Sequence, residues 1–288
     1  MMKYLLLILF VFIYINGISQ NKRQKKFLPP GTVRINDTLF ADESEVSNLS
    51  WRECLYYFKK YDSLRVVQML PDTTVWGYDT TYGDTDGKVA QAKWINLQIF
   101  SENYFRHPGF NNYPVVGISY DQAIAFCNWR TKAANFVVYC KENKIENWNE
   151  HINDSIPIKF YYRLPTKEEW EMIASGSHSL SVHPFGFDSV YKKWKKKYVK
   201  IANCVFPLSL SDSVKKCIPL TATTKSYFPN SFKVYNTIGN VSEMVMEYGV
   251  AKGGSFAHKL EECRIANNQS YTKPEGWLGF RCVAVMIR

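Results

Sequence analysis

Polar and apolar residues recur at helical intervals in two stretches, each of which begins with a capping pair. Ser119 stands three residues before Gln122, and Thr166 stands three residues before Glu169. In such a capping box, each of the two side chains accepts a hydrogen bond from the backbone of the other residue. The sequence therefore predicts a helix from each pair. Gly176 is placed to end the second helix.

Short strands are predicted near both ends of the chain. The segments "TVRI" at 32–35 and "TLFA" at 38–41 flank an Asn-Asp turn, which predicts a β-hairpin. A further helix is expected in "SNLSWRECLYYFKKYD" at 47–62, because its apolar residues lie near helical spacing. From residue 235 onward, the pattern predicts strands joined by tight turns.

Two long segments, 68–112 and 177–235, show no sustained periodicity and are predicted to be mostly loop. The chain has no internal repeat and no evident linker after residue 30. We therefore expect one α+β domain over residues 31–288, with two main helices and much irregular structure.

The first 19 residues have the pattern of a secretory signal peptide, with one Lys, an apolar run and small residues at Gly17 and Ser19. Residues 20–30 form a basic linker. The apolar run is too short, and this polar segment follows too soon, for a comfortable spanning helix. We expect an exported protein with no transmembrane span after cleavage; a retained N-terminal anchor is the alternative.

Composition favours a folded protein, since apolar residues make up 46% of the chain and aromatic residues 16%. The net charge is +10, and the densest basic run is "YKKWKKKYVK" at 191–200. We interpret this run as a solvated lysine face with Trp194 and Tyr198 turned inward. An exported protein is not expected to meet nucleic acid, which leaves acidic glycans or membrane surfaces as alternatives for the basic charge.

The candidate metal and nucleophile residues form no recognised local motif. His107, His151, His178 and His183 are scattered along the chain and lack the spacing of a metal site. The seven cysteines are an odd number, so at least one thiol is free or pairs with another molecule. Export makes disulfides possible.

Seven segments, in order, resemble the formylglycine-generating-enzyme (sulfatase-modifying-factor) family. They are "ESEVSN", "YPVVGISYDQAIAFCNW", "YRLPTKEEWEMIASG", "HPFG", "YNTIGNVSEMV", "KGGSF" and "LGFRC". The resemblance covers about residues 31–288 and implies a single compact α+β fold related to C-type lectins, with low regular secondary structure. "LPDTTVW" and "ENYFRHPGFNNYPVVG" are also similar to bacterial gliding-motility and type IX secretion lipoproteins, but this chain lacks their lipid-attachment Cys.

The resemblance implies a calcium site in "YNTIGNVSEMV". Its ligands would be the side chain of Asn236, the backbone carbonyls of Gly239 and Val241, and the carboxylate of Glu243. Hard oxygen ligands on a tight turn suit Ca²⁺. The alternative is that Asn236 and Asn240 only hydrogen-bond the turn backbone.

A second calcium site of the family uses an Asn near Asn203 and an Asp near residue 216. Lys216 and Cys217 stand at that point here. A cation is not expected to bind beside Lys216.

The resemblance also bears on the cysteines. Cys127 and Cys282 match a disulfide of the catalytic members, and Cys204 and Cys217 fall where the second calcium site is lost. Bonds in both pairs would leave an odd set of Cys54, Cys140 and Cys263. Within that set, either Cys54 pairs with Cys140 while Cys263 is buried, or Cys263 is an exposed, reactive thiol.

The catalytic members bind Cu(I) through two thiolates, because soft sulfur ligands suit that ion. Relative to Phe256 of "GGSF", the two thiolate positions fall on His258 and Cys263. The first thiolate is therefore missing, and Ser255, His258 and Cys263 form a degenerate site.

Two hypotheses follow. In the first, the protein is a non-catalytic scaffold or binding protein of a Gram-negative periplasm or cell envelope, with an envelope protein as partner, for example in a secretion or gliding-motility assembly. In the second, it is a metal-dependent oxidoreductase of the formylglycine-generating type that uses the degenerate His/Cys site with copper or iron.

Overall fold

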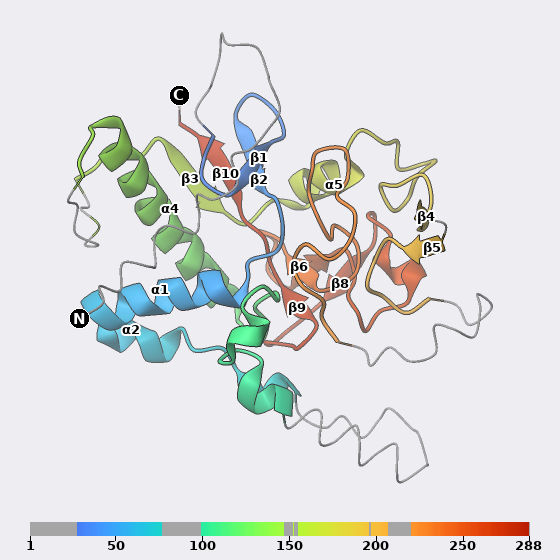
Figure 1. The fold of residues 1–288 in the computed structure, drawn as a ribbon, viewed down its shortest axis with the longest axis horizontal. Coiled ribbons are helices and arrows are strands. Elements are labelled where there is room, and N and C mark those ends of the chain that lie inside the picture. Colours follow the sequence, from blue (N-terminus) through green and yellow to red (C-terminus); the bar gives the residue numbers. More distant parts are fainter. Residues whose placement is uncertain are drawn as a thin grey trace.

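Figure 1 shows the fold of the protein as a computed structural model, which describes residues 28–76, 99–146, 152, 155–195, 197–206 and 220–287. The predicted signal peptide and Cys217 lie outside the described residues. Within these ranges, no helix combines the length and the apolar character that crossing a membrane requires.

The predicted helices are present and begin at the expected caps. The α-helices are α1 (Asn48–Tyr61), α2 (Ser63–Gln68), α4 (Tyr120–Glu142) and α5 (Lys167–Ser175). Short 3₁₀ helices cover Thr73–Trp76, Pro108–Phe110 and Leu260–Cys263. Ser119 and Thr166 cap α4 and α5 through the predicted capping boxes, and Gly176 ends α5 with a φ of 62°. These local predictions are confirmed.

The strands form two four-stranded sheets and one hairpin. Their bounds are β1 Thr32–Arg34, β2 Leu39–Asp42, β3 Phe160–Arg163, β4 Tyr191–Trp194, β5 Lys197–Lys200, β6 Ser242–Met244, β7 Val250–Lys252, β8 Asn268–Ser270, β9 Leu278–Gly279 and β10 Val283–Met286. The first sheet has the order β1-β2-β10-β3, with all neighbours antiparallel. The second has the order β8-β7-β6-β9, in which β6 and β9 run parallel.

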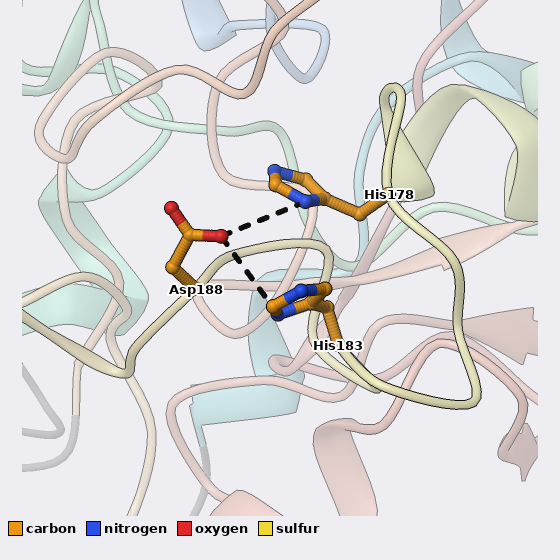
Figure 2. Close-up of side chains that lie close together, drawn as sticks. All are labelled: His178, His183 and Asp188. Atoms are coloured by element: carbon orange, nitrogen blue, oxygen red, sulfur yellow. Dashed lines mark ion pairs between the residues drawn. The ribbon is translucent and has the colours of Figure 1, made fainter.

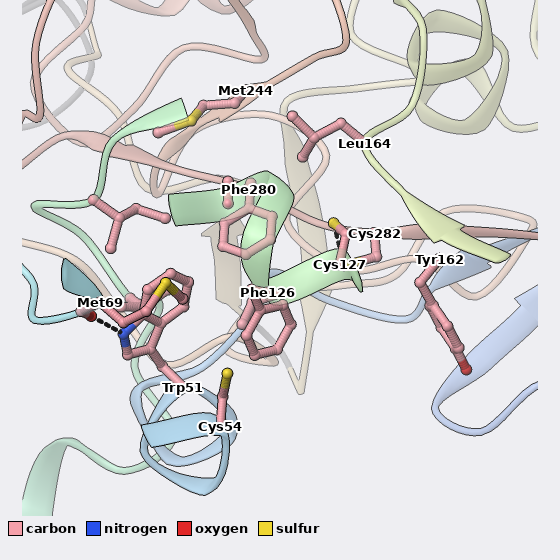
Figure 3. Close-up of a cluster of buried hydrophobic side chains, with 14 of the residues drawn as sticks. Trp51, Cys54, Met69, Phe126, Cys127, Tyr162, Leu164, Met244, Phe280 and Cys282 are labelled. Atoms are coloured by element: carbon pink, nitrogen blue, oxygen red, sulfur yellow. Dashed lines mark hydrogen bonds between the residues drawn. The ribbon is translucent and has the colours of Figure 1, made fainter. Parts of the chain in front are cut away.

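The main core lies between α1, α4 and the first sheet. Trp51 stacks on Phe126 at 5.3 Å between ring centroids, and Phe280 meets both rings edge-on. Figure 3 shows this cluster, with the indole N–H of Trp51 donating to the backbone oxygen of Met69. Burial of such aromatic surface stabilises the fold by about 25 cal/mol per Å² removed from water.

A second hydrophobic cluster underlies the C-terminal half of the chain. Trp170 and Ala174 of α5 pack with Cys263 and Ile265, and Phe185 of the loop after α5 covers them. Mixed helices and strands therefore build a single domain, and the α+β prediction is confirmed.

The basic run departs from its prediction. The described residues of this run form the antiparallel pair β4 and β5, within a region that the sequence predicts to be mostly irregular. The prediction of inward aromatics is wrong, since Trp194 is 54% exposed and Tyr198 74% exposed. The hairpin has only two strands and is only partly covered, with Trp194 beside Phe228 at 5.6 Å between ring centroids, so alternation along its strands does not create a buried side.

Candidate functional site

The segment implied as a calcium site forms a tight turn against the second sheet. Asn236, Gly239 and Asn240 all adopt positive φ, at 50°, 71° and 63°. A Cβ on Gly239 would lie 2.5 Å from the backbone oxygen of Asn203. Only glycine fits that approach, because any side chain would collide with backbone that cannot move aside.

Glu243 lies in β6 and is committed to protein partners. Its side chain is 1% exposed, and both carboxylate oxygens accept hydrogen bonds at 2.5 Å from the guanidinium of Arg281. The indole N–H of Trp170 donates to the same carboxylate at 2.7 Å. These bonds balance the charge of a buried carboxylate.

Glu45 joins this group from the segment that follows β2, and it is not among the residues predicted from the sequence. Its carboxylate accepts hydrogen bonds from the side-chain amides of Asn240, at 2.8 Å, and Asn236, at 3.2 Å. Burial raises the pKa of Glu45 to about 8, with Arg281 opposing and Glu243 adding to the rise. In the sequence, Glu45 is marked only by its place in "ESEVSN".

These donors suit a hard cation in part. Asn236 Oδ1 is buried and has no hydrogen-bond partner, and the Nδ2 of the same amide donates to the buried carboxylate of Glu45. An amide oxygen and carboxylates are the ligands that Ca²⁺ prefers. Glu243, however, is already neutralised by Arg281. The structure therefore makes Glu45 and Asn236 the better candidates to hold a calcium ion, with Glu243 at its edge.

Asn203, at the position of the second family calcium site, is hydrogen-bonded to the same turn. The side-chain amide of Asn203 donates to the backbone oxygen of Leu220 at 2.7 Å, and its own backbone oxygen accepts from Asn240 at 2.7 Å. Lys216 and Cys217 lie outside the described residues. Asn203 here braces the turn through hydrogen bonds.

Ser255 and His258 are brought together as a hydrogen-bonded pair. Ser255 is fully buried, its Oγ lies 2.7 Å from His258 Nδ1, and it accepts a bond from the N–H of Ala257. Burial lowers the pKa of His258, which favours the neutral imidazole. His258 also lines a surface pocket of about 330 Å³ with Trp277.

Cys263 does not match an exposed, reactive thiol. It is fully buried, and its sulfur donates to the backbone oxygen of Lys259 at 3.4 Å. A hydrogen bond with the Cys204 thiol, together with burial, raises the pKa of Cys263 far above its usual value. A protonated thiol is a poor nucleophile and a poor metal ligand.

The other cysteines fall into separate places. The sulfurs of Cys127 and Cys282 lie 3.6 Å apart in the main core (Figure 3), so the fold brings the predicted pair together, and the bond itself stays a prediction. Cys54 packs in the same core, whereas Cys140 belongs to a different cluster with Phe136. Cys204, predicted to bond Cys217, lies against Cys263.

Two of the histidines that the sequence analysis treated as scattered lie close together. His178 and His183 share the loop between α5 and β4, and their rings are 4.8 Å apart between centroids. Asp188 lies beside both. His178 and His183 are therefore not scattered in the folded chain, because the loop folds back and removes the separation that the sequence shows. His151 lies outside the described residues.

Comparisons with known proteins find one domain family and several relatives. The profile of the family described as "Sulfatase-modifying factor enzyme 1-like domain" matches residues 12–286. The mouse "Formylglycine-generating enzyme" is 25% identical over 230 residues, which cover 68% of this chain and 52% of the mouse protein. The bovine "Inactive C-alpha-formylglycine-generating enzyme 2" is 25% identical over 191 residues, covering 60% of this chain and 50% of the relative. The chain thus spans about half the length of these relatives.

Among solved structures, PvdO from Pseudomonas aeruginosa matches 86% of this chain and 80% of its own, with 19% identity and a TM-score of 0.45. "Treponema denticola variable protein 1" matches 90% of this chain and 92% of its own, with 17% identity and a TM-score of 0.44.

Proposed function

Because the chain belongs to the sulfatase-modifying factor enzyme 1-like domain family, we propose that it is a non-catalytic member that acts as a scaffold or binding protein of the cell envelope. The observation that carries this proposal is the state of Cys263. Its thiol is buried and donates to the backbone oxygen of Lys259. With His258 at the other expected thiolate position, no pair of thiolates is available at these two positions for Cu(I).

The Ser255–His258 pair does not restore catalysis by another route. A nucleophilic serine needs its hydroxyl in reach of a substrate, with a base to accept its proton. Ser255 has the base but is fully buried. The proposal is supported by the bovine relative, which is similar to this chain and is itself named as inactive.

The test is direct. Purified protein is incubated with Cu(I), O₂ and a Cys-x-Pro-x-Arg peptide, and the peptide mass is followed. We expect no conversion of the cysteine to an aldehyde. The Streptomyces coelicolor relative named "Formylglycine-generating enzyme", 24% identical over 298 residues, serves as the positive control. Turnover by this chain, or tight stoichiometric copper or iron on the purified protein, supports the oxidoreductase alternative.

We propose calcium as the structural ion of this domain, held by Glu45 and Asn236 with the carbonyls of Gly239 and Val241 and with Glu243 at the edge. The orphaned Asn236 Oδ1 and the two adjacent buried carboxylates support this assignment. An ion that binds only the folded state raises the melting temperature by mass action. We expect Ca²⁺ to raise it, EDTA to reverse the rise, and Glu45→Gln to abolish it.

The matched control is Glu261→Gln, which removes a carboxylate with a side chain that is 66% exposed. This variant should keep the full calcium response. If EDTA leaves the melting curve of the unaltered protein unmoved, the calcium proposal fails while the non-catalytic proposal stands.

An exported location and an envelope partner complete the proposal, on the support of the signal-peptide pattern at 1–19 and of a basic, exposed β4–β5 hairpin. Cross-linking in the native envelope followed by purification identifies the partner. Recovery of the chain in the cytosolic fraction would contradict the location.

A further inference from the structure

The loop between α5 and β4 presents three metal-binding side chains to one point. Figure 2 shows both imidazoles of His178 and His183 turned toward the carboxylate of Asp188. Asp188 Oδ1 lies 3.7 Å from His178 Nδ1 and 3.8 Å from His183 Nδ1. One donor atom from each residue lies within 4.8 Å of the other two.

These distances are close to those around a bound ion. Ligand atoms about 2.0–2.2 Å from a tetrahedral zinc ion are roughly 3.3 Å from one another. The two distances from Asp188 to the histidines exceed this value by a few tenths of an ångström, and every pair of donor atoms lies within 4.8 Å. Closing these gaps around an ion requires rotation of the three side chains.

The backbone of the loop is fixed independently of any ion. His183 N–H donates to the backbone oxygen of Ser179 at 2.8 Å, and Pro184 accepts a bond from Ile265 at 2.9 Å. Gly186 has a φ of 70°, and a Cβ there would lie 2.4 Å from the backbone oxygen of Ala174. Because this scaffold is preformed, binding an ion orders little additional chain.

The hydrophobic cluster anchors the loop from beneath. Phe185 and Phe187 pack against the cluster of Trp170 and Ile265, so alternate residues of the loop point inward. The histidine side chains are only 28% and 27% exposed, whereas Asp188 is 83% exposed. An ion can therefore enter from solvent on the aspartate side and meet two partly sheltered imidazoles.

We propose that His178, His183 and Asp188 bind one divalent first-row transition-metal ion, with Zn²⁺ as the best fit. Imidazole nitrogen suits zinc, copper, nickel and iron, and a carboxylate completes the donor set. Calcium and magnesium prefer all-oxygen ligands and fit poorly. Three protein ligands leave at least one coordination position for water or for a group of a bound partner. This site is independent of the buried calcium candidate and of the proposed function.

The experiment uses the full chain, stripped of metal with a chelator and titrated calorimetrically with Zn²⁺. We expect one equivalent to bind. His178→Gln, His183→Gln and Asp188→Asn should each weaken binding about tenfold or more, since even residues that only orient a ligand cost ten- to a hundred-fold. His107→Asn is the matched control, because His107 caps a separate 3₁₀ helix and Asn can still accept that bond.

Co²⁺ in place of Zn²⁺ distinguishes this site from the sulfur atoms of the chain. We expect visible bands of a nitrogen and oxygen site, without thiolate-to-cobalt charge transfer. Circular dichroism of each variant confirms that it is folded. The proposal is overturned if Zn²⁺ does not bind stoichiometrically, if the triple variant binds as tightly as the unaltered chain, or if Cys204→Ser removes the binding.

Discussion

Glu243 and Asp188 are both carboxylates beside cationic or cation-binding side chains, and their surroundings differ in almost every respect. Glu243 is 1% exposed and holds Arg281 in a paired, fully enclosed arrangement. Asp188 is 83% exposed and lies near two histidines at ion-pair distances beyond hydrogen bonding. We call the first region the buried charge centre (Glu45, Asn236, Asn240, Glu243 and Arg281) and the second the histidine loop (178–188).

The difference shows that a motif match and an available metal site are separate matters. In the buried charge centre, the matched acid is already neutralised by the protein, so an ion must compete with Arg281. In the histidine loop, no motif was recognised, yet the donors are accessible. Both regions rest on the hydrophobic cluster that contains Trp170, which bonds Glu243 on one side and packs with Phe185 on the other.

The largest effect on the free energy of unfolding is expected from the cysteines. One cysteine pair lies beside each region. A Cys127–Cys282 bond next to Arg281 would close a loop of 155 residues, for which chain entropy gives about 4–5 kcal/mol as an upper figure. Cys282→Ser should therefore lower the free energy of unfolding strongly if the bond forms.

Non-reducing peptide mapping of protein alkylated at lysis also decides whether Cys204 bonds Cys217 or Cys263. An alkyl label on Cys282 would show that the Cys127–Cys282 bond does not form.

Breaking the buried charge centre comes next. Glu243→Ala removes the only carboxylate among the described residues that bonds the Arg281 guanidinium directly and leaves Glu45 and Asp42 as the nearby acids, so we expect a loss of unfolding free energy of up to about 3–5 kcal/mol. Asp188→Ala removes an exposed group and should leave urea unfolding unchanged. Replacing both Glu243 and Arg281 with leucine should recover much of the loss. Equal effects of Glu243→Ala and Asp188→Ala would erase the contrast between the two regions.

Two glycines test whether the conformation of each region depends on a close approach between backbone segments. Gly239→Ala and Gly186→Ala each force a Cβ to within 2.5 Å of a backbone oxygen at positive φ. Each should cost more than about 1 kcal/mol. Gly249→Ala is the control, because it has a φ of 78° but only an ordinary contact at 3.4 Å. Only Gly186→Ala should also weaken Zn²⁺ binding, and a matching loss in Gly239→Ala would argue against a local effect.

The last test of the buried charge centre is a pH dependence from Glu45. Its folded pKa of about 8 lies above the unfolded value of about 4.3, so the folded state holds its proton more tightly. The stability that this provides is full below about pH 4.3 and is lost as pH rises through about 8. Glu45→Gln should flatten this slope. Glu53, whose pKa burial raises to about 7, contributes in the same direction, so the measured quantity is the difference between the unaltered protein and Glu45→Gln. Ca²⁺ should bind more tightly at pH 9 than at pH 6, since it takes the ionised carboxylate.

The helix starts and the first hairpin could be predicted from the sequence because they depend on residues close together in the chain. The capping boxes at Ser119 and Thr166 depend on residues three positions apart, and the β1–β2 hairpin depends on one turn. The exposure of Trp194 and Tyr198 was not readable, because it depends on whether another layer covers the hairpin. Alternation along a strand predicts two faces and does not say that either is buried.

By itself, the sequence determined the starts of α4 and α5, the α+β class, and the family to which the chain belongs. Only the tertiary structure decided what each charged group meets. Glu45 reaches Asn236 across 191 residues, and Arg281 reaches Glu243 across 38. His178, His183 and Asp188 converge because Phe185 and Gly186 fold their loop onto α5. Such contacts are set by burial and by chain closure over long separations, and neither leaves a periodic pattern in the residues themselves.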